Sequence, residues 1–205
     1  MRSDAILQSR LDDVCAAGWD IWEQFDRTVR ERDFHPFIPA DYEIVRAALL
    51  THRAPGARFL EWGSATGVIT IMADMMGFEA YGIELDGALV ATARTLAARF
   101  GSDARFVAGS FLPTGYRWQA REVDETTGNT GAGPSGYLQL GRALGDFDVV
   151  FGYPWGGEAP MMLDLMQRYG SPDALLLLND TNDGVRAYRR GVSVNPAPAR
   201  ILRTE

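Results

Sequence analysis

The chain has 205 residues, of which 46% are hydrophobic, and a net charge of −7. This length and apolar content suit one ordinary domain with its own buried core. All 20 basic residues are arginine, which excludes Schiff-base chemistry from a lysine and the lysine of a phosphate-binding P-loop. The acidic balance argues against a broad nucleic-acid-binding surface.

The cysteine content and the hydropathy indicate the cellular compartment that we expect for the protein. Cys15 is the single cysteine, so it forms no internal disulfide, and we expect no metal site because no Cys/His spacing resembles one. The first 20 residues carry acids every few positions and lack the apolar core of a signal peptide. No later stretch approaches the roughly 20 apolar residues of a membrane span. We expect a cytoplasmic protein without membrane contacts; its oligomeric state is left open.

The front of the chain is predicted to be helical. Apolar residues recur at three- and four-residue steps over 4–33 and form one stripe. A second helix is predicted over 41–52. We interpret residues 1–52 as an N-terminal helical cap on a domain of residues 53–205, within one compact unit. The placement stays open: the segment folds over the carboxyl edge of the sheet, or its helix packs on the sheet's flank or on another subunit.

From residue 57 onward, short apolar runs alternate with helical patterns, which is typical of successive βα units and a parallel sheet. Strands are predicted at 57–62, 79–84, 104–108, 147–152 and 174–179. Helices are predicted at 67–76, 87–100, 136–144 and 159–169. The fold class is therefore α/β, a mostly parallel sheet flanked by helices.

Two further segments complete the predicted map. A C-terminal hairpin is expected to pair 185–190 with 199–203. The stretch 113–146 contains a run of turn-forming residues at 128–136, and it is either a mobile lid or a plain flexible loop.

The first strand leads into a turn of small residues, Glu61-Trp62-Gly63-Ser64-Ala65-Thr66-Gly67, and then into a helical pattern. A strand, a tight turn and a helix N-terminus bring backbone N–H groups to one place, which suits a polar or anionic ligand group. Gly63 and Gly67 allow close approach of the backbone to that ligand. The next strand ends at Glu84, near the offset at which Rossmann-type folds place an acid on ribose hydroxyls.

A dinucleotide site is disfavoured by the same turn. The G-x-G-x-x-G fingerprint read from Gly63 has Ala65 and Val68 where the second and third glycines belong. The NAD(P)-dependent oxidoreductase interpretation therefore ranks third.

The two motifs, E-W-G-S-A-T-G and Y-G-I-E-L-D, resemble those of class I S-adenosylmethionine-dependent methyltransferases, loosely those of small non-SET protein-lysine methyltransferases. The resemblance implies the Rossmann-like class I methyltransferase fold and S-adenosylmethionine as cofactor. It implies that Glu61 faces the amino-acid end of the cofactor, that Glu84 holds the ribose and that Leu85 and Asp86 line the adenine side. The cofactor-binding residues it implies are Glu61, Gly63, Ser64, Ala65, Gly67, Glu84, Leu85, Gly109, Ser110 and Phe111; Ala65 stands for the usual middle glycine and Ser110 for a common Asp.

The fourth strand leads into Tyr153, Pro154 and Trp155, at the edge of the sheet where ligands of α/β proteins bind. This loop resembles the acceptor loop of amino-methyltransferases, whose Asp or Asn is replaced here by Tyr153. We expect Tyr153, Pro154, Trp155 and His35 to bind the methyl acceptor. Tyr153 and Glu158 are the catalytic candidates, with Asp180 and His35 as further candidate bases.

The sequence thus predicts a methyltransferase whose acceptor, a small molecule or a protein side chain, is unknown; nucleic acid is disfavoured as a partner by the net charge. The alternative is a cofactor-binding or regulatory module without catalysis, suggested by Ala65 and Ser110.

Overall fold

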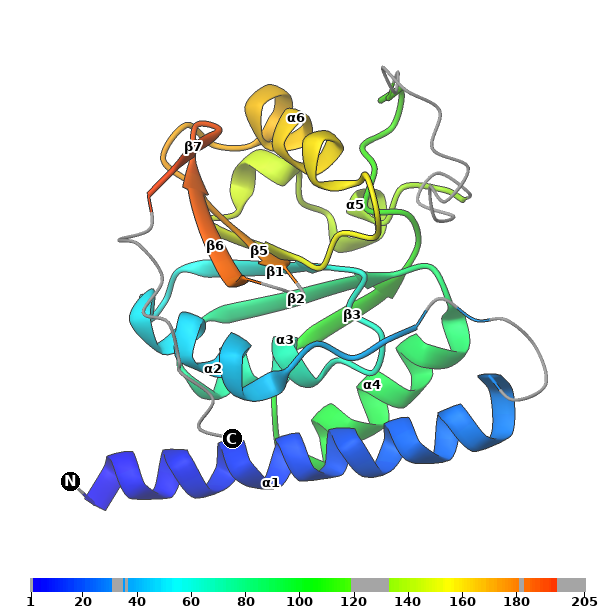
Figure 1. Cartoon of the computed structure of the whole chain (residues 1–205), viewed down its shortest axis with the longest axis vertical. Coiled ribbons are helices and arrows are strands. Elements are labelled where there is room, and N and C mark those ends of the chain that lie inside the picture. Colours follow the sequence, from blue (N-terminus) through cyan, green and yellow to red (C-terminus); the bar gives the residue numbers. More distant parts are fainter. Residues whose placement is uncertain (1, 31–34, 36, 119–132, 181–182, 195–205) are drawn as a thin grey trace.

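The computed structural model describes residues 2–30, 35, 37–118, 133–180 and 183–194. Its centre is a seven-stranded sheet with the order β3-β2-β1-β4-β5-β6-β7 (Figure 1). The strands are β1 (Arg58–Trp62), β2 (Glu79–Glu84), β3 (Arg105–Ala108), β4 (Val149–Gly152), β5 (Leu175–Asp180), β6 (Gly184–Arg189) and β7 (Val192–Ser193). Strands β1 to β5 pair in parallel and β6 and β7 pair antiparallel. The predicted α/β fold is confirmed.

Helices cover both faces of this sheet. The helices are α1 (Arg2–Phe25), α2 (Tyr42–Thr51), α3 (Val68–Met75), α4 (Gly87–Phe100), α5 (Tyr137–Leu140) and α6 (Ala159–Tyr169), with a π-helical turn η1 (Asp26–Arg30) and a 3₁₀ turn η2 (Leu144–Asp146). Figure 1 shows α1 to α4 on one side of the sheet and α5 and α6 on the other. Helix α5 is shorter than the predicted 136–144, because Gly141 ends it in a left-handed conformation.

The core lies in two apolar layers, one on each face of the sheet. Successive strand residues point to opposite faces: Phe59 belongs to the layer under α1 to α4, and Leu60 to the layer under α6. On β4, Phe151 belongs to the layer under α1 to α4 and Val150 to the layer under α6. All four are essentially fully buried, and each such side chain contributes roughly 1.5–3 kcal/mol.

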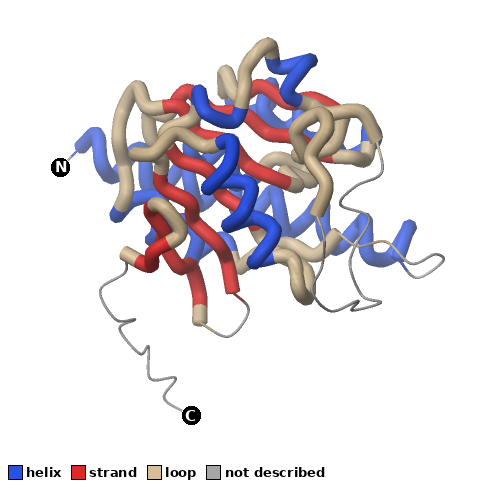
Figure 2. Tube along the Cα trace, turned by 90° about the horizontal axis from the view of Figure 1, so that it is seen from above, coloured by secondary structure: helices blue, strands red, loops and turns tan. Residues whose placement is uncertain are grey.

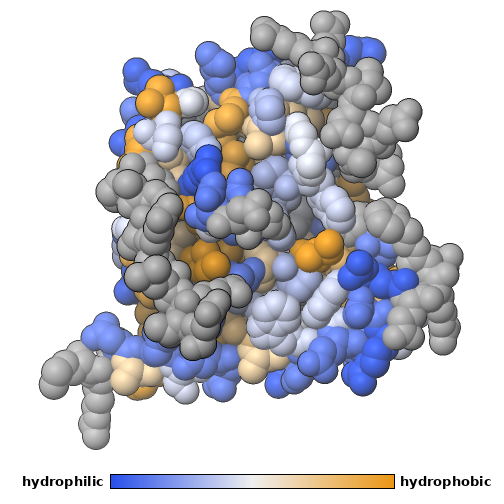
Figure 3. Space-filling model, viewed as in Figure 1, coloured by the Kyte–Doolittle hydropathy of each residue, from blue (hydrophilic) through white to orange (hydrophobic). Residues whose placement is uncertain are grey.

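The N-terminal helix packs on the flank of this assembly. Leu11 and Val14 are fully buried where α1 contacts α3. The guanidinium of Arg10 donates a hydrogen bond to the carbonyl of Phe100, the last residue of α4, at 2.9 Å. Helix α2 packs on α3 and β6. Figure 3, in the same view as Figure 1, shows mostly hydrophilic residues along the lower edge that α1 forms.

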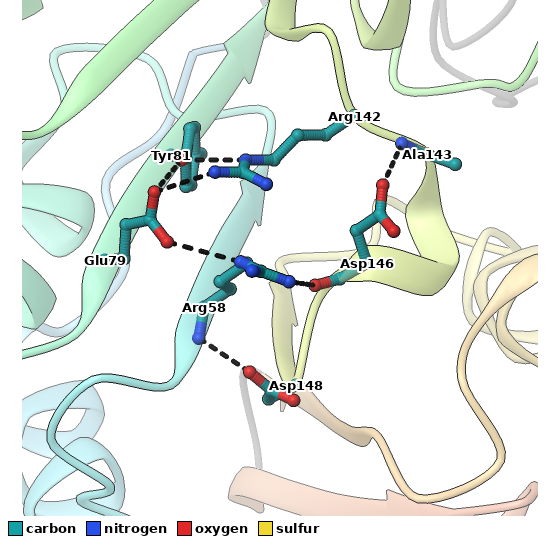
Figure 4. A network of polar contacts seen from close by, with 7 residues as sticks. All are labelled: Arg58, Glu79, Tyr81, Arg142, Ala143, Asp146 and Asp148. Atoms are coloured by element: carbon teal, nitrogen blue, oxygen red, sulfur yellow. Dashed lines mark hydrogen bonds and ion pairs between the residues drawn. The ribbon is translucent and has the colours of Figure 1, made fainter.

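A polar network closes the amino edge of the sheet (Figure 4). The guanidinium of Arg58 donates to Glu79 at 3.3 Å, and its backbone N–H donates to Asp148 at 2.8 Å. Arg142 donates to Glu79 at 2.9 Å and to the hydroxyl of Tyr81 at 2.8 Å. Arg58 also donates to the carbonyl of Asp146 at 3.2 Å, so the network joins the amino ends of β1 and β2 to the turn η2.

The described end of the sheet contains a hairpin that the sequence did not predict. Strand β6 pairs with β7 through Arg189 and Val192, and the predicted partner at 199–203 lies outside the described residues. The turn between β6 and β7 has two residues, Arg190 and Gly191, which both have positive φ, 51° and 76°, as tight hairpins require. Figure 2 shows this hairpin at the edge of the sheet.

The segment 113–146 is described only in part. Residues 119–132, which hold most of the predicted lid or flexible loop, lie outside the described residues. The chain between 133 and 136 lies beside β3, where Ser110 and Ser135 form an isolated bridge. No helix in the described ranges is long and apolar enough to cross a membrane.

Candidate functional site

The turn after β1 has the backbone shape that its glycines predict. Gly63 has φ +69° and Gly67 has φ +80°, and Ala65 also has a positive φ, 43°. The carbonyl of Ile83 on β2 accepts hydrogen bonds from the N–H groups of Gly63 and Ser64 at 2.9 and 3.0 Å. This pairing fixes the turn against the next strand.

The two glycines have different neighbours. A Cβ added at Gly63 would meet nothing within 4 Å, so this part of the turn faces open space. A Cβ at Gly67 would lie 2.7 Å from the ring of Phe106 and 2.8 Å from Ala93. Gly67 therefore lets α3 pack closely against its neighbours, whereas Gly63 leaves room for a ligand beside the backbone.

Glu61 lies at the buried base of the turn. Glu61 is only 4% exposed. Its carboxylate accepts hydrogen bonds from the backbone N–H of Thr70, at 3.0 Å, and from the Thr70 hydroxyl. Burial raises the pKa of Glu61 from 4.5 to about 8, against the lowering effect of the two Thr70 bonds. A cationic partner would stabilise the ionised form of a carboxyl group that is buried in this way.

Glu84 ends β2 and faces the same turn. Its Oε2 accepts a hydrogen bond from the backbone N–H of Ala65 at 2.9 Å, and its Oε1 accepts one from the backbone N–H of Asp86 at 3.0 Å. Both oxygens are thus fixed in place, and a carboxylate oxygen can accept more than one bond. The contact between the N–H of Ala65 and Glu84 is one that sequence reasoning missed.

A cavity of about 150 Å³ lies between this turn, the end of β2 and the loop after β4. It brings together many of the residues predicted from sequence: His35, Gly63, Ala65, Glu84, Leu85, Phe111, Tyr153, Trp155 and Glu158. One wall is aromatic, because Trp62 stacks on Phe111 with ring centroids 5.3 Å apart. A smaller, adjoining cavity of about 40 Å³ is lined by Glu61, Ser64 and Ala65.

Three of the predicted cofactor-binding residues, Gly67, Gly109 and Ser110, do not line either cavity. Gly67 lies in the packed part of the turn, as described above. The N–H of Ser110 donates to the carbonyl of Pro134 at 2.9 Å, and its carbonyl accepts from the N–H of Gly136 at 2.8 Å. A Cβ at Gly109 would come within 2.9 Å of Gly136. These two residues hold the returning chain beside β3, and a role in binding the adenine base stays a prediction.

The segment that follows η1 reaches the cavity as well. The Nδ1 of His35 accepts from the N–H of Phe37 at 3.1 Å, so its Nε2 carries the proton and donates to Asp86 at 3.2 Å. Phe37 and Ile38 line the cavities. Each of the two placements considered for the N-terminal region therefore describes one part of it: α1 packs on the flank, and 37–40 borders the cavity. The division at residues 52 and 53 stays a prediction.

The His35–Asp86 contact was not foreseen. His35 was predicted to bind the acceptor, but its ring nitrogens hold the chain to the end of β2, and its ring packs at 4.9 Å from Phe25. No local pattern signals a contact across 51 residues.

The loop after β4 lies across the cavity from Glu84. Its turn is closed by Glu158, which accepts a hydrogen bond from the N–H of Trp155 at 3.0 Å and is 2% exposed. Tyr153 is half-buried, and burial, with the charge of Asp180, raises the pKa of its hydroxyl. A second pocket of about 270 Å³ lies beyond Tyr153 and is lined by Ile38, Tyr153, Trp155 and Asp180 among others.

The residues present fit an S-adenosylmethionine molecule on three observations. The buried carboxylate of Glu61 suits the ammonium end of the amino-acid moiety. The Oγ of Ser64 is buried and has no hydrogen-bond partner among the described residues. The open space at Gly63 lies between Glu61 and the carboxylate of Glu84, which suits a pair of hydroxyls.

Comparison with known proteins agrees with this arrangement. A segment of 108 residues is 32% identical to the ribosomal protein L11 methyltransferase of Thermus thermophilus; it spans 50% of this chain and 42% of that relative, so less than half of the relative's length is matched. No family model matches the chain.

Two solved structures align with this chain, and the first of them has a similar fold. An RNA methyltransferase from Salinibacter ruber, in complex with S-adenosyl-L-homocysteine, aligns over 69% of this chain and 76% of its own with 19% identity and a TM-score of 0.51. A precorrin-6y C5,15-methyltransferase from Geobacter metallireducens aligns over 72% and 67% with 17% identity and a TM-score of 0.49. The first of these structures shows that the chain has the class I methyltransferase fold, which the resemblance of its motifs implies.

Proposed function

We propose that this chain is an S-adenosylmethionine-dependent methyltransferase. The observation that carries the proposal is the shared cavity: the carboxylate of Glu84, the open turn at Gly63 and the aromatic loop at Tyr153 and Trp155 all border the same space. A cofactor lying along the turn and an acceptor lying against the loop would then meet at its centre. The local identity to a methyltransferase supports the proposal.

Each end of the cofactor has a proposed set of partners. Glu61 and the turn residues Ser64 and Ala65 bind the amino-acid moiety. Glu84 accepts hydrogen bonds from the two ribose hydroxyls, and each bond to its charged carboxylate contributes about 1.5–3 kcal/mol. Leu85 and Phe111 border the cavity on the side proposed for the adenine base.

The chemistry demanded of the chain is modest. The bound cofactor supplies an activated methyl group, so the residues of the loop need mainly to hold an acceptor atom in line with it. Burial and Asp180 hold the pKa of Tyr153 above its usual range, so at neutral pH its hydroxyl is protonated and positions an acceptor as a hydrogen-bond partner. Glu158, buried and bonded to Trp155, keeps the loop in shape; we propose that it is a positioning residue.

The proposal is tested in two steps with the full chain. Titration with S-adenosylmethionine, S-adenosylhomocysteine and NADH should give binding of the first two and none of the third. Incubation with a methyl-labelled donor and a pool of candidate acceptors should then transfer label. Binding without transfer to any acceptor would favour the non-catalytic module, and NADH binding in place of S-adenosylmethionine would favour the oxidoreductase.

The partners and the setting of the protein are also part of the proposal. A net charge of −7 disfavours a phosphate-rich acceptor by repulsion, although one protein of similar fold is named as an RNA methyltransferase. A cytoplasmic location stays a proposal, which cell fractionation tests.

A further inference from the structure

We propose that Tyr137 is a positioning residue of the cofactor site, which holds the indole of Trp62 in the aromatic wall of the 150 Å³ cavity. The inference rests on the proposed function and deepens it by naming a residue that acts on the adenine side of the cofactor without lining the cavity. Three observations carry it: the hydrogen bond between the two side chains, the burial of both residues, and the way in which the chain before Tyr137 is held beside β3.

The aromatic wall consists of Trp62 and Phe111. Both residues line the cavity that Glu84 and Leu85 also line. Their rings stack with centroids 5.3 Å apart and an angle of 21° between the ring planes. The energy of contacts between flat rings depends on their relative orientation, so the orientation of the wall affects the binding of a flat adenine base.

A hydrogen bond fixes the indole of Trp62 from behind the wall. Its Nε1–H donates to the hydroxyl oxygen of Tyr137 at 2.8 Å. Trp62 is 2% exposed and Tyr137 is 7% exposed, so both groups are largely removed from water. An indole N–H can only donate, and a buried donor without a partner is unfavourable. The bond therefore holds the indole in one orientation before a ligand binds, which lowers the entropy lost on binding.

The hydroxyl of Tyr137 stays in the form that can accept this bond and also donate. Burial raises the pKa of Tyr137, against the lowering effect of the bond from Trp62. Tyr137 does not line the 150 Å³ cavity or the smaller cavity beside Glu61. Its effect on a bound cofactor therefore passes through Trp62.

The position of Tyr137 is set by the chain that returns beside β3. The N–H of Gly136 donates to the carbonyl of Ser110 at 2.8 Å. A Cβ added at Gly136 would lie 2.8 Å from a methyl group of Ile83, so glycine lets the chain lie directly against β2. Tyr137 follows Gly136, and Phe111 follows Ser110. One pairing of the backbone therefore holds both halves of the wall: Phe111 directly, and Trp62 through Tyr137.

Tyr137→Phe tests the role of the hydroxyl, because it removes the hydroxyl and keeps the ring. The full chain and the variant are titrated with S-adenosylhomocysteine in a calorimeter. We expect the variant to bind about fivefold more weakly, which is the effect of one hydrogen bond of ordinary strength. An unchanged affinity would overturn the inference.

The matched control is Tyr116→Phe. Tyr116 is also buried in the apolar layer under α6, and its hydroxyl is bonded to Asp164 at 2.9 Å. It does not line the two cavities. Tyr116→Phe should lower the melting temperature and leave the affinity for S-adenosylhomocysteine unchanged. Equal losses of affinity in the two variants would point to a general loss of stability and would overturn the inference.

A double-mutant cycle separates an action through Trp62 from a structural role of Tyr137. Trp62→Phe keeps an aromatic ring in the wall and removes the indole N–H that Tyr137 binds. In this background, Tyr137→Phe should cause no further loss of affinity, because the bond is already absent. The same loss in both backgrounds would overturn the inference.

The parent chain gives a readout that does not depend on the folding of a variant. The indole N–H of Trp62, assigned by NMR from its proximity to the rings of Phe111 and Tyr137, should exchange slowly with deuterated solvent, because it is buried and bonded. Fast exchange would overturn the inference and leave the proposed function standing. Failure of the parent chain to bind S-adenosylhomocysteine would overturn both.

Discussion

The backbone N–H of Ala65 donates a hydrogen bond to the carboxylate of Glu84 at 2.9 Å. This bond ties the turn after the first strand to the end of the second, so the two motifs recognised in the sequence form one structure. The carboxylate that is proposed to hold the ribose is thereby oriented before any ligand arrives. Preorganisation of this kind lowers the entropy lost on binding.

Glu84→Ala should weaken the binding of S-adenosylmethionine by about a hundredfold or more, since it removes the acceptor of two charged hydrogen bonds worth about 1.5–3 kcal/mol each. Isothermal titration measures the change. Glu79→Ala is the matched control, because Glu79 lies on the same strand at the opposite edge, in the network with Arg58 and Arg142. Glu79→Ala should lower the melting temperature and leave the affinity for S-adenosylmethionine unchanged. Equal losses of affinity in the two variants would refute the assignment of Glu84 to the ribose.

Gly63→Val should abolish cofactor binding, because the new side chain would enter the open space at the turn. The variant also carries backbone strain, since φ is +69° and a side chain there costs about 1–2 kcal/mol. Gly56→Val isolates that strain: Gly56 has φ +83° and no atom within 4 Å of an added Cβ, and it does not line the cavities. Both variants should lose similar thermal stability, and only Gly63→Val should lose binding.

The raised pKa of Glu61 predicts that the free energy of unfolding depends on pH. Its pKa is raised from 4.5 to about 8 by burial, so between these pH values the folded chain holds a proton that the unfolded chain has released. The free energy of unfolding therefore falls as the pH rises from about 4.5 to about 8, by up to about 1.4 kcal/mol per pH unit. Glu61→Gln should flatten this part of the profile.

Urea denaturation of both proteins at pH 5, 6.5 and 8 measures the difference. The parent should lose more stability than Glu61→Gln over this range, and parallel profiles would show that Glu61 is not protonated in the folded chain. In the proposed complex the cofactor's ammonium group favours the Glu61 carboxylate, so binding at pH 7 should release protons. Titration in buffers of different ionisation enthalpy detects that release.

The two parts of the N-terminal region should respond differently to substitution. Leu11→Ala, at the fully buried contact of α1 with α3, should lower the free energy of unfolding by about 2–5 kcal/mol and leave cofactor affinity unchanged. Ile38→Ala, at the cavity, should weaken affinity roughly fourfold to fifteenfold, as one or two buried methylene groups contribute about 0.8 kcal/mol each. The opposite pattern would place α1, rather than the 37–40 segment, over the site.

The strands could be predicted because a buried parallel strand leaves a local trace, such as the apolar runs at 58–62 and 175–178, and the positions of Glu61 and Glu84 follow from where those strands end. Contacts between distant residues leave no such trace. The bond from His35 to Asp86, the positive φ of Ala65 and the pairing of Ser110 with Pro134 depend on tertiary structure. The hairpin through Arg190 and Gly191 was missed because β7 has only two residues and leaves no recognisable pattern.

A crystal structure of the full chain with S-adenosylhomocysteine would locate the cofactor site. We expect the ribose hydroxyls on the carboxylate of Glu84, the amino group of the homocysteine moiety at Glu61, and the sulfur atom facing Tyr153 and the pocket beyond it. A ligand bound elsewhere, or bound with its ribose away from Glu84, would show that the turn after β1 and the end of β2 do not form the cofactor site.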